Sequence, residues 1–169
     1  TLCCLAALVL VTASALGQDK PMATPADGHT VHVLAPHVVA GKVMGPYHHY
    51  CKTLSPEPVI ECLCYSSTDP NARLEQVEYI FAKSITRTGA VTLADWNKNW
   101  HDHKQEISTG RVQVLDMPPD KAKEVADLVS TTDGIIYHLW DHEAKVPNGK
   151  ALIAPVSYTH LTLPTTSRV

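Results

Sequence analysis

The amino-acid sequence predicts an α+β domain in which a mainly antiparallel sheet carries one clear helix packed on one face. Several short segments are rich in β-branched and aromatic residues and are separated by turn residues, as the strands of an antiparallel sheet are. A later segment, which begins at Pro118-Pro119-Asp120, places its apolar residues at helical spacing instead. This order of elements favours an α+β architecture.

The segments before residue 66 give one ambiguous element and one strand. Residues 30–44 are apolar with interspersed histidines, and their period fits a helix and a strand equally. Pro36 argues against a single uninterrupted element, and Gly45-Pro46 is expected to end it. Residues 59–65 carry β-branched side chains after a turn-like segment at 55–58, so we expect a strand there.

The middle of the chain predicts two further strands. Residues 76–85 place Val77 and Tyr79 on one face, and Glu78 and Ile80 on the other. Residues 93–100 are expected to form a short helix or a turn. Residues 111–116 alternate between polar and apolar side chains, which predicts a strand.

The segment from Pro119 is the clearest helix, because proline suits the first helical turn. Thr132-Asp133-Gly134 is expected to end this helix. Strands then follow at residues 135–140 and from Ala151. The helix presents one apolar stripe that can pack on the sheet, formed by Ala122, Val125, Ala126, Leu128 and Val129.

Charge and hydropathy exclude two classes of partner. The 169-residue chain has a formal net charge of −3, and both signs of charge are interspersed along it. No basic patch with interleaved aromatic residues predicts nucleic-acid binding. No apolar span after the N-terminal segment predicts a transmembrane helix in the mature chain. The expected partners are therefore a small molecule or a metal ion.

The two ends of the sequence are expected to lie outside the folded domain. Residues 1–17 contain a short apolar run followed by small residues, as in a secretory signal peptide, so we expect a secreted or periplasmic protein. Residues 156–165 match the in-frame translation of a transposon-end sequencing adapter. Residues 156–169 are therefore treated as non-native, and His160 is left out of the site. A single domain is expected over residues 18–155.

Three cysteines remain in this domain: Cys51, Cys62 and Cys64. In an oxidising compartment Cys51 can pair with either of the other two, which leaves one thiol over. The sequence does not choose between these pairings.

Histidine is the most unusual feature of the composition, with nine residues besides His160. Several histidines lie in polar-aromatic clusters, and Glu78 lies inside a predicted strand, where a buried carboxylate needs a partner. Imidazole is the commonest transition-metal ligand and also an acid or base near neutral pH. The candidate metal ligands are His48, His49, Glu78, His101, His103 and His138.

Spacing suggests how these groups meet. His101 and His103 are two residues apart, so on a strand they project to one face and can hold one ion. His138 from an adjacent strand and the Glu78 carboxylate would complete a set that suits Zn, Mn or Fe, and Glu106 lies near if a turn intervenes. The alternative is that each histidine pairs separately with an acid or a backbone group.

The sequence also resembles the oil body-associated protein family, whose members are catalogued as a domain of unknown function. The resemblance extends from residue 48 to residue 140. Its blocks are His48-His49-Tyr50-Cys51, residues 61–65, residues 69–74, Val77-Glu78-Tyr79-Ile80, Trp100-His101-x-His103 with Glu106 and Gly110, and Tyr137-His138-Leu139-Trp140. The chain would be an exported, bacterial-type member, because plant members are intracellular and lack a signal peptide.

The resemblance implies a shared fold and a shared polar cluster, but no reaction. Because Cys51 and Cys62 match positions of intracellular relatives, it makes an obligatory disulfide between them less expected. The predicted function is binding of a divalent metal or a small polar ligand. The alternatives are a hydrolase- or isomerase-type enzyme, with His101 or His138 as the base and Glu78 orienting it, and a non-catalytic lipid- or surface-association module.

Overall fold

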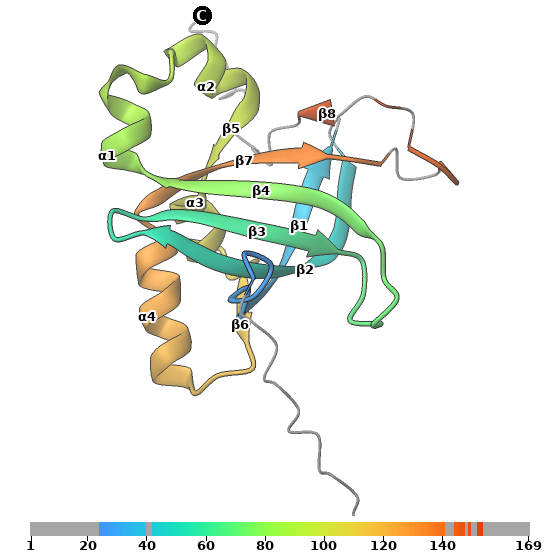
Figure 1. Cartoon of the computed structure of the whole chain (residues 1–169). Helices are drawn as coiled ribbons and strands as arrows, with labels where there is room; N and C mark the ends of the chain where they lie inside the picture. Colours follow the sequence, from blue (N-terminus) through green and yellow to red (C-terminus); the bar gives the residue numbers. More distant parts are fainter. Residues whose placement is uncertain (1–23, 40–41, 141–143, 148, 150–151, 154–169) are drawn as a thin grey trace, which may run out of the picture.

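The described strands pair into one antiparallel sheet (Figure 1). The computed structural model describes residues 24–39, 42–140, 144–147, 149 and 152–153, so the predicted signal peptide and residues 156–169 lie outside the described residues. The strand order is β5-β7-β4-β3-β2-β1-β6, and β8 pairs with β7. The strands are β1 (Val31–Val39), β2 (Lys42–Ser55), β3 (Val59–Tyr65), β4 (Leu74–Ala82), β5 (Trp100–Asp102), β6 (Gln113–Leu115), β7 (Thr132–His138) and β8 (Leu152–Ile153).

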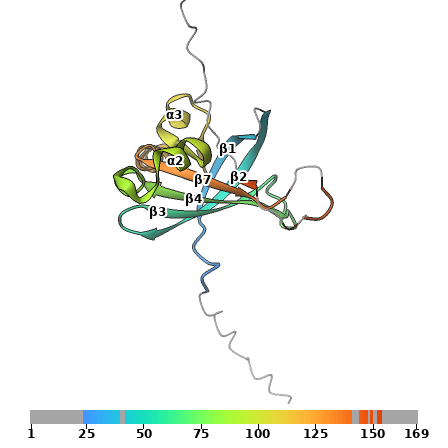
Figure 2. The same cartoon turned by 90° about the horizontal axis from the view of Figure 1, so that it is seen from above.

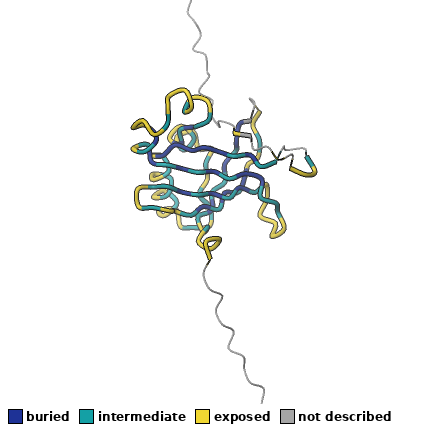
Figure 3. Tube along the Cα trace, turned by 45° about the horizontal axis from the view of Figure 1, so that its top comes forward, coloured by how far each residue is buried: buried dark blue, intermediate teal, exposed yellow. Residues whose placement is uncertain are grey.

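The sheet curls, and its inner face is the buried one. Seen from above, β1 and part of β2 rise at a steep angle from β3 and β4 (Figure 2). Side chains alternate along β3 and β4 between buried and half-buried positions, as the period of two residues requires. The burial pattern follows this alternation along the central strands, whereas exposed residues gather in the loops and helices (Figure 3).

Several short helices accompany the sheet, so the prediction of one helix on one face is wrong, although the protein remains broadly α+β. The described helices are α1 (Lys83–Ile85), the π-helical turn η1 (Thr86–Ala90), α2 (Leu93–Asn99), α3 (His103–Ser108) and α4 (Pro119–Val129). Only α4 is long enough to show an apolar stripe, so α1, η1 and α3 were not predicted, whereas α2 lies where a short helix or a turn was expected. Within the described part of the chain, no helix combines the length and the apolar composition needed to cross a bilayer.

Several boundaries also differ from the sequence prediction; for example, the strand expected over residues 76–85 ends at Ala82, and Lys83–Ile85 form α1. Residues 30–44 form β1 and the start of β2, and Gly45-Pro46 lies within β2 instead of ending the segment. The register between β1 and β2 shifts between Ala35 and His37, and such an irregularity accommodates proline in a strand. Thr132-Asp133-Gly134 begins β7 rather than only ending a helix, because β4 and β5 pair with it on both sides.

The core of the inner face contains a disulfide. Cys51 on β2 and Cys62 on β3 are directly paired in register and are joined by a disulfide bond. This is the pairing that the resemblance to intracellular relatives made less expected. Cys64 is a buried free thiol on the same face. These cysteines pack with Tyr47, Ile60 and Ile80 in one buried cluster, which fixes β2, β3 and β4 to one another.

A buried carboxylate fastens the helical segment α1–η1–α2 to the outer face of β7. Asp133 is fully buried and accepts hydrogen bonds from Arg87 (3.0 and 2.7 Å), Thr86 Oγ1 (2.5 Å) and Trp96 Nε1 (3.1 Å). Burial by itself raises the pKa of Asp133, but the hydrogen bonds from Arg87, Thr86 and Trp96 outweigh it and hold the pKa below its ordinary value. The ionised form therefore stabilises the fold.

Substituting Asp133→Asn is expected to lower the free energy of unfolding by about 2 kcal/mol at pH 7, less than for a fully buried ion pair because Arg87 is partly exposed. A lowered folded-state pKa stabilises the protein above the unfolded pKa of about 4, and this contribution is lost as the pH falls through the folded value. Urea denaturation should therefore give wild-type and variant stabilities that converge as the pH falls below the unfolded pKa and through the lower folded value. Asp127→Asn on the exposed face of α4 is the control, with a change of under about 0.5 kcal/mol. Equal stability of Asp133→Asn and wild type at pH 7 would contradict this role.

Candidate metal centre

The site is built around Glu78, which is buried in the middle of β4 and points to the inner face of the sheet. Its strand lies between β3 and β7, opposite Cys62 on one side and Ile136 on the other. An ionised carboxylate at such a position is costly unless charged or hydrogen-bonding groups surround it. Two groups of histidines lie around its two oxygens, and each group could hold a metal ion.

The first group contains Glu78, His101 and His103. The pairwise distances between His101 Nε2, His103 Nε2 and Glu78 Oε1 are all 3.1 Å. Two ligands of one tetrahedral ion with bonds of about 2.0–2.1 Å lie about 3.3 Å apart, so this triangle has nearly the size of one face of a coordination tetrahedron. The three atoms are therefore spaced as ligands of one ion would be.

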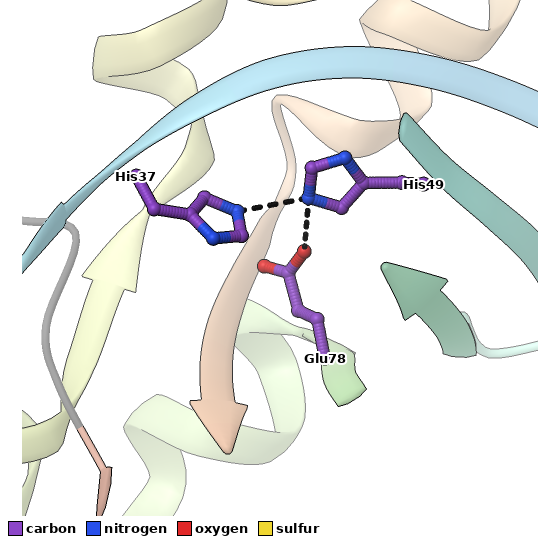
Figure 4. Close-up of side chains that lie close together, drawn as sticks. All are labelled: His37, His49 and Glu78. Carbon is purple, nitrogen blue, oxygen red and sulfur yellow. Dashed lines mark hydrogen bonds and ion pairs between the residues drawn. The ribbon is translucent and has the colours of Figure 1, made fainter. Parts of the chain in front are cut away.

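The second group contains His37, His49 and the other oxygen of Glu78 (Figure 4). His37 Nε2 lies 2.8 Å from His49 Nε2, and His49 Nε2 lies 3.6 Å from Glu78 Oε2. The far nitrogen of each ring is already engaged. His49 Nδ1 lies 3.0 Å from the carbonyl oxygen of Tyr47, and His37 Nδ1 contacts the side-chain oxygen of Gln76.

Strand alternation and local turns position these side chains. His101 is the middle residue of β5, whereas His103 is the first residue of α3, so the two are not on one strand as predicted, although their ring nitrogens meet. The helix also places Glu106 one turn later, with Oε2 3.9 Å from His101 Nε2. Gly134 on β7 lies opposite His101, and its lack of a side chain leaves the space that Glu78 and His101 fill.

Burial sets the charge state of the site. Burial lowers the pKa of both His37 and His49, which favours neutral rings with free lone pairs. Burial raises the pKa of Glu78, but hydrogen bonds from His101 and His103 hold it well below its ordinary value, so the carboxylate is ionised. Burial also raises the pKa of Glu106. Burial would lower the pKa of His101, but the nearby carboxylates of Glu106 and Glu78 raise it above its ordinary value. A cation bound by His101 would have to displace this proton, since metal ions bind the neutral imidazole.

The six predicted ligands do not all meet. Glu78, His49, His101 and His103 converge in the two groups. His138 is buried near His37, with ring centroids 6.1 Å apart, but belongs to neither group. Its Nε2 atom is buried without a hydrogen-bond partner.

His48 lies on the opposite face of β2 from His49, because neighbouring strand residues point to opposite sides. Its Nδ1 lies 2.9 Å from His32 Nε2, and the other nitrogen of His32 lies 2.6 Å from Asp116. Sequence reasoning missed His37, which lies in a segment of ambiguous period. Read as a strand, that segment places His37 on the same face as Val33 and Ala35, which line the site.

A small cavity of about 100 Å³ lies beside the donor atoms. Helices α3 and α4 cover it, and the donor residues of both groups form part of its wall. The rest of the wall is mainly apolar and includes Val33, Ala35, Ile80, Val114 and Val125. An ion at the donor atoms would therefore face a space that is suited to a small ligand with an apolar part.

Comparisons with known proteins connect the chain to a family. A family model described as "Protein of unknown function (DUF1264)" matches residues 23–165. Oil body-associated protein 1B from Arabidopsis thaliana is 33% identical over 94 residues, which are 55% of this chain and 37% of that protein. Oil body-associated protein 2B from Zea mays is 33% identical over 85 residues, 50% of this chain and 32% of that protein. The matched part thus spans about a third of these relatives.

These matches confirm the resemblance drawn from the sequence blocks. No solved structure matches the chain significantly.

Adding one methyl group at Gly134 tests whether the site depends on the space there. A Cβ atom at this position would lie 2.5 Å from Glu78 Oε1 and 2.5 Å from His101 Cε1. Gly134→Ala should therefore cost about 1–3 kcal/mol of stability and move the His101 ring. The imidazole signals in a nitrogen-15 NMR spectrum would report this movement.

The control is Gly110→Ala, where the added carbon meets nothing within 4 Å and only the positive φ of 68° is unfavourable. It should cost about 1–2 kcal/mol without moving the signals of His101 or His103. Unchanged imidazole signals in Gly134→Ala would show that the close packing at Gly134 is not required.

Proposed function

We propose that this chain, which belongs to the DUF1264 family of proteins of unknown function, binds a divalent transition-metal ion through Glu78, His101 and His103. Zn, Mn and Fe(II) are the ions that such a set of imidazole and carboxylate ligands suits. The single observation that carries the proposal is the triangle of three donor atoms at 3.1 Å from one another, buried beneath α3 and α4.

The hydrogen bonds of His103 support a cation at this point. The Thr132 hydroxyl donates its proton to the carbonyl oxygen of Val129 at 2.6 Å, so it accepts the hydrogen bond of 2.9 Å from His103 Nδ1. His103 Nε2 lies 3.1 Å from Glu78 Oε1, and the hydrogen bond between them lowers the pKa of the Glu78 carboxyl. A metal ion bound here would take the place of the proton between these two atoms. Metal-bound histidines commonly donate their other N–H to an acceptor, as His103 does to Thr132.

The cavity beside the donor atoms supports a further ligand on the ion. Three protein ligands leave a coordination position free, and sites of this kind bind water or a small molecule there. Glu106 also lies at this wall, close enough to His101 to contact the same molecule. The proposed function is therefore metal-dependent binding of a small ligand.

Metal binding is tested on the purified, chelator-treated chain by calorimetric titration with Zn²⁺ and Mn²⁺. Removing a ligand with His103→Ala should weaken binding by at least about 100-fold. Thr132→Val keeps the volume but removes the acceptor that orients His103, so affinity should fall about 10- to 100-fold. His48→Ala, on the outer face, is the matched histidine control and should bind as wild type does.

The outcome that contradicts the proposal is a wild-type chain with no stoichiometric metal and no metal-induced rise in melting temperature. Equal effects of His103→Ala and His48→Ala would also contradict it. Circular dichroism of each variant separates loss of binding from loss of folding.

An enzyme that uses the same residues is the second candidate, because Glu106, His101 and Glu78 all border the cavity. A general acid or base must reach its substrate directly or through one water, and these groups are within such reach of a bound molecule. Hydrolysis of 4-nitrophenyl butyrate, whose acyl chain suits an apolar wall, is a suitable probe. Metal-dependent turnover lost in Glu106→Gln, with metal content unchanged, would support catalysis. Turnover equal to that of free metal would exclude it for this ester.

The described surface gives the surface-association alternative little support. The large exposed apolar side chains belong to β2, α2, α4, β8 and residues 144–147, rather than to one element. They are Val43, Leu54, Leu93, Leu128, Val146 and Ile153. Association with lipid surfaces is therefore not part of the proposal.

A further inference from the structure

The two oxygens of Glu78 face different histidine pairs. Oε1 lies 3.1 Å from both His101 Nε2 and His103 Nε2, whereas Oε2 lies 3.6 Å from His49 Nε2. His37 Nε2 then lies 2.8 Å from His49 Nε2 on the side away from the first group. The carboxylate thus stands between two sets of nitrogen donors and presents one oxygen to each.

The hydrogen bonds of the second pair leave two lone pairs facing each other. His49 Nδ1 donates to the carbonyl oxygen of Tyr47, and His37 Nδ1 donates to the side-chain oxygen of Gln76. Because these partners are pure acceptors, both protons of the neutral rings lie on Nδ1. The Nε2 atoms therefore meet lone pair to lone pair at 2.8 Å, on two side chains that are almost fully buried. A cation between them removes this repulsion.

We propose that the second group, His37 and His49 with Glu78 Oε2, holds a second divalent metal ion, and that Glu78 bridges the two ions. This proposal rests on the proposed function, since the first ion occupies Glu78, His101 and His103. Carboxylate-bridged pairs of ions lie about 3.5–4 Å apart in proteins. The spacing of 3.6 Å between His49 Nε2 and Glu78 Oε2 is close to the edge of about 3.3 Å expected for two ligands of one tetrahedral ion.

His138 supplies an additional observation at the same place. Its ring centroid lies 6.1 Å from that of His37, and its Nε2 atom is buried with no hydrogen-bond partner. A buried unpaired nitrogen is costly and calls for an explanation. Movement of this ring toward the His37–His49 pair would give the second ion a further nitrogen ligand, directly or through a bound water. Glu106, whose Oε2 lies 3.9 Å from His101 Nε2, is the comparable additional group beside the first ion.

The number of ions per chain tests this proposal. Elemental analysis of the full chain, saturated with Mn²⁺ and freed of excess ion, should give two ions for wild type and one for His37→Ala. Should His37→Ala fold poorly, His37→Gln keeps most of the volume and should also hold one. His48→Ala should retain two. Electron paramagnetic resonance of the wild type should show two magnetically coupled Mn²⁺ ions, and the His37 variants should show the spectrum of an isolated ion.

The outcomes separate the two proposals. Zero ions in wild type would overturn both of them. One ion in wild type and one in His37→Ala would leave the first site standing and overturn the second, with a shared proton between His37 and His49 as the remaining explanation. Two ions without magnetic coupling would overturn the bridge by Glu78.

Discussion

An ionised carboxylate in the centre of a sheet sets the main constraint on this protein. Glu78 lies on β4, with hydrogen-bonded strands on both sides and helices over its inner face, so water does not stabilise its charge. Compensation comes from the imidazoles of His101 on β5 and His103 on α3, and the histidine pair on β1 and β2 lies beside the other carboxylate oxygen. The curl of the sheet is therefore part of the site, because it brings β1 over the strand that carries Glu78 (Figure 2).

The inner wall of the sheet is built to accept this cluster. Gly134 leaves room on β7 where any larger residue would collide with Glu78 and His101. On the other side, the disulfide between Cys51 and Cys62 joins the strand of His49 to the strand next to Glu78. The missing side chain at Gly134 and the disulfide between Cys51 and Cys62 thus both help to fix the distances among the donor atoms. Preorganisation of this kind lowers the conformational cost of binding.

Sequence patterns predicted which residues form the site better than they predicted how those residues are arranged. A polar residue inside an apolar alternation singled out Glu78, and the spacing of two residues joined His101 to His103. The same alternation places His48 and His49 on opposite faces of β2, so two histidines that are adjacent in sequence do not belong to one site. His37 was not predicted because its contact with His49 depends on pairing between β1 and β2, and the period of its own segment was ambiguous.

Local sequence patterns predicted the secondary structure only in part. Helix α4 could be predicted from its proline start and apolar stripe, whereas α1 and α3 are too short to carry a periodic signal, and α2 was expected only as a short helix or a turn. Strand β7 begins three residues after α4 ends, and its pairing with both β4 and β5 decides the conformation of Thr132 and Gly134. Such long-range pairing is a property of the whole sheet, which a local window does not contain.

The short strand β5 connects the stability of the helical segment to the lifetime of the site. Asp102 lies between His101 and His103 in sequence, caps α3 and forms ion pairs with Lys83 (2.6 Å) and Arg87 (2.9 Å) on the outer side. Local opening of α1 and η1 would break these ion pairs and loosen the segment that carries both histidines. For an ion bound as proposed, the frequency of that opening would set the residence time. Charges on the outer face of the sheet would thus control how fast a metal on the inner face exchanges.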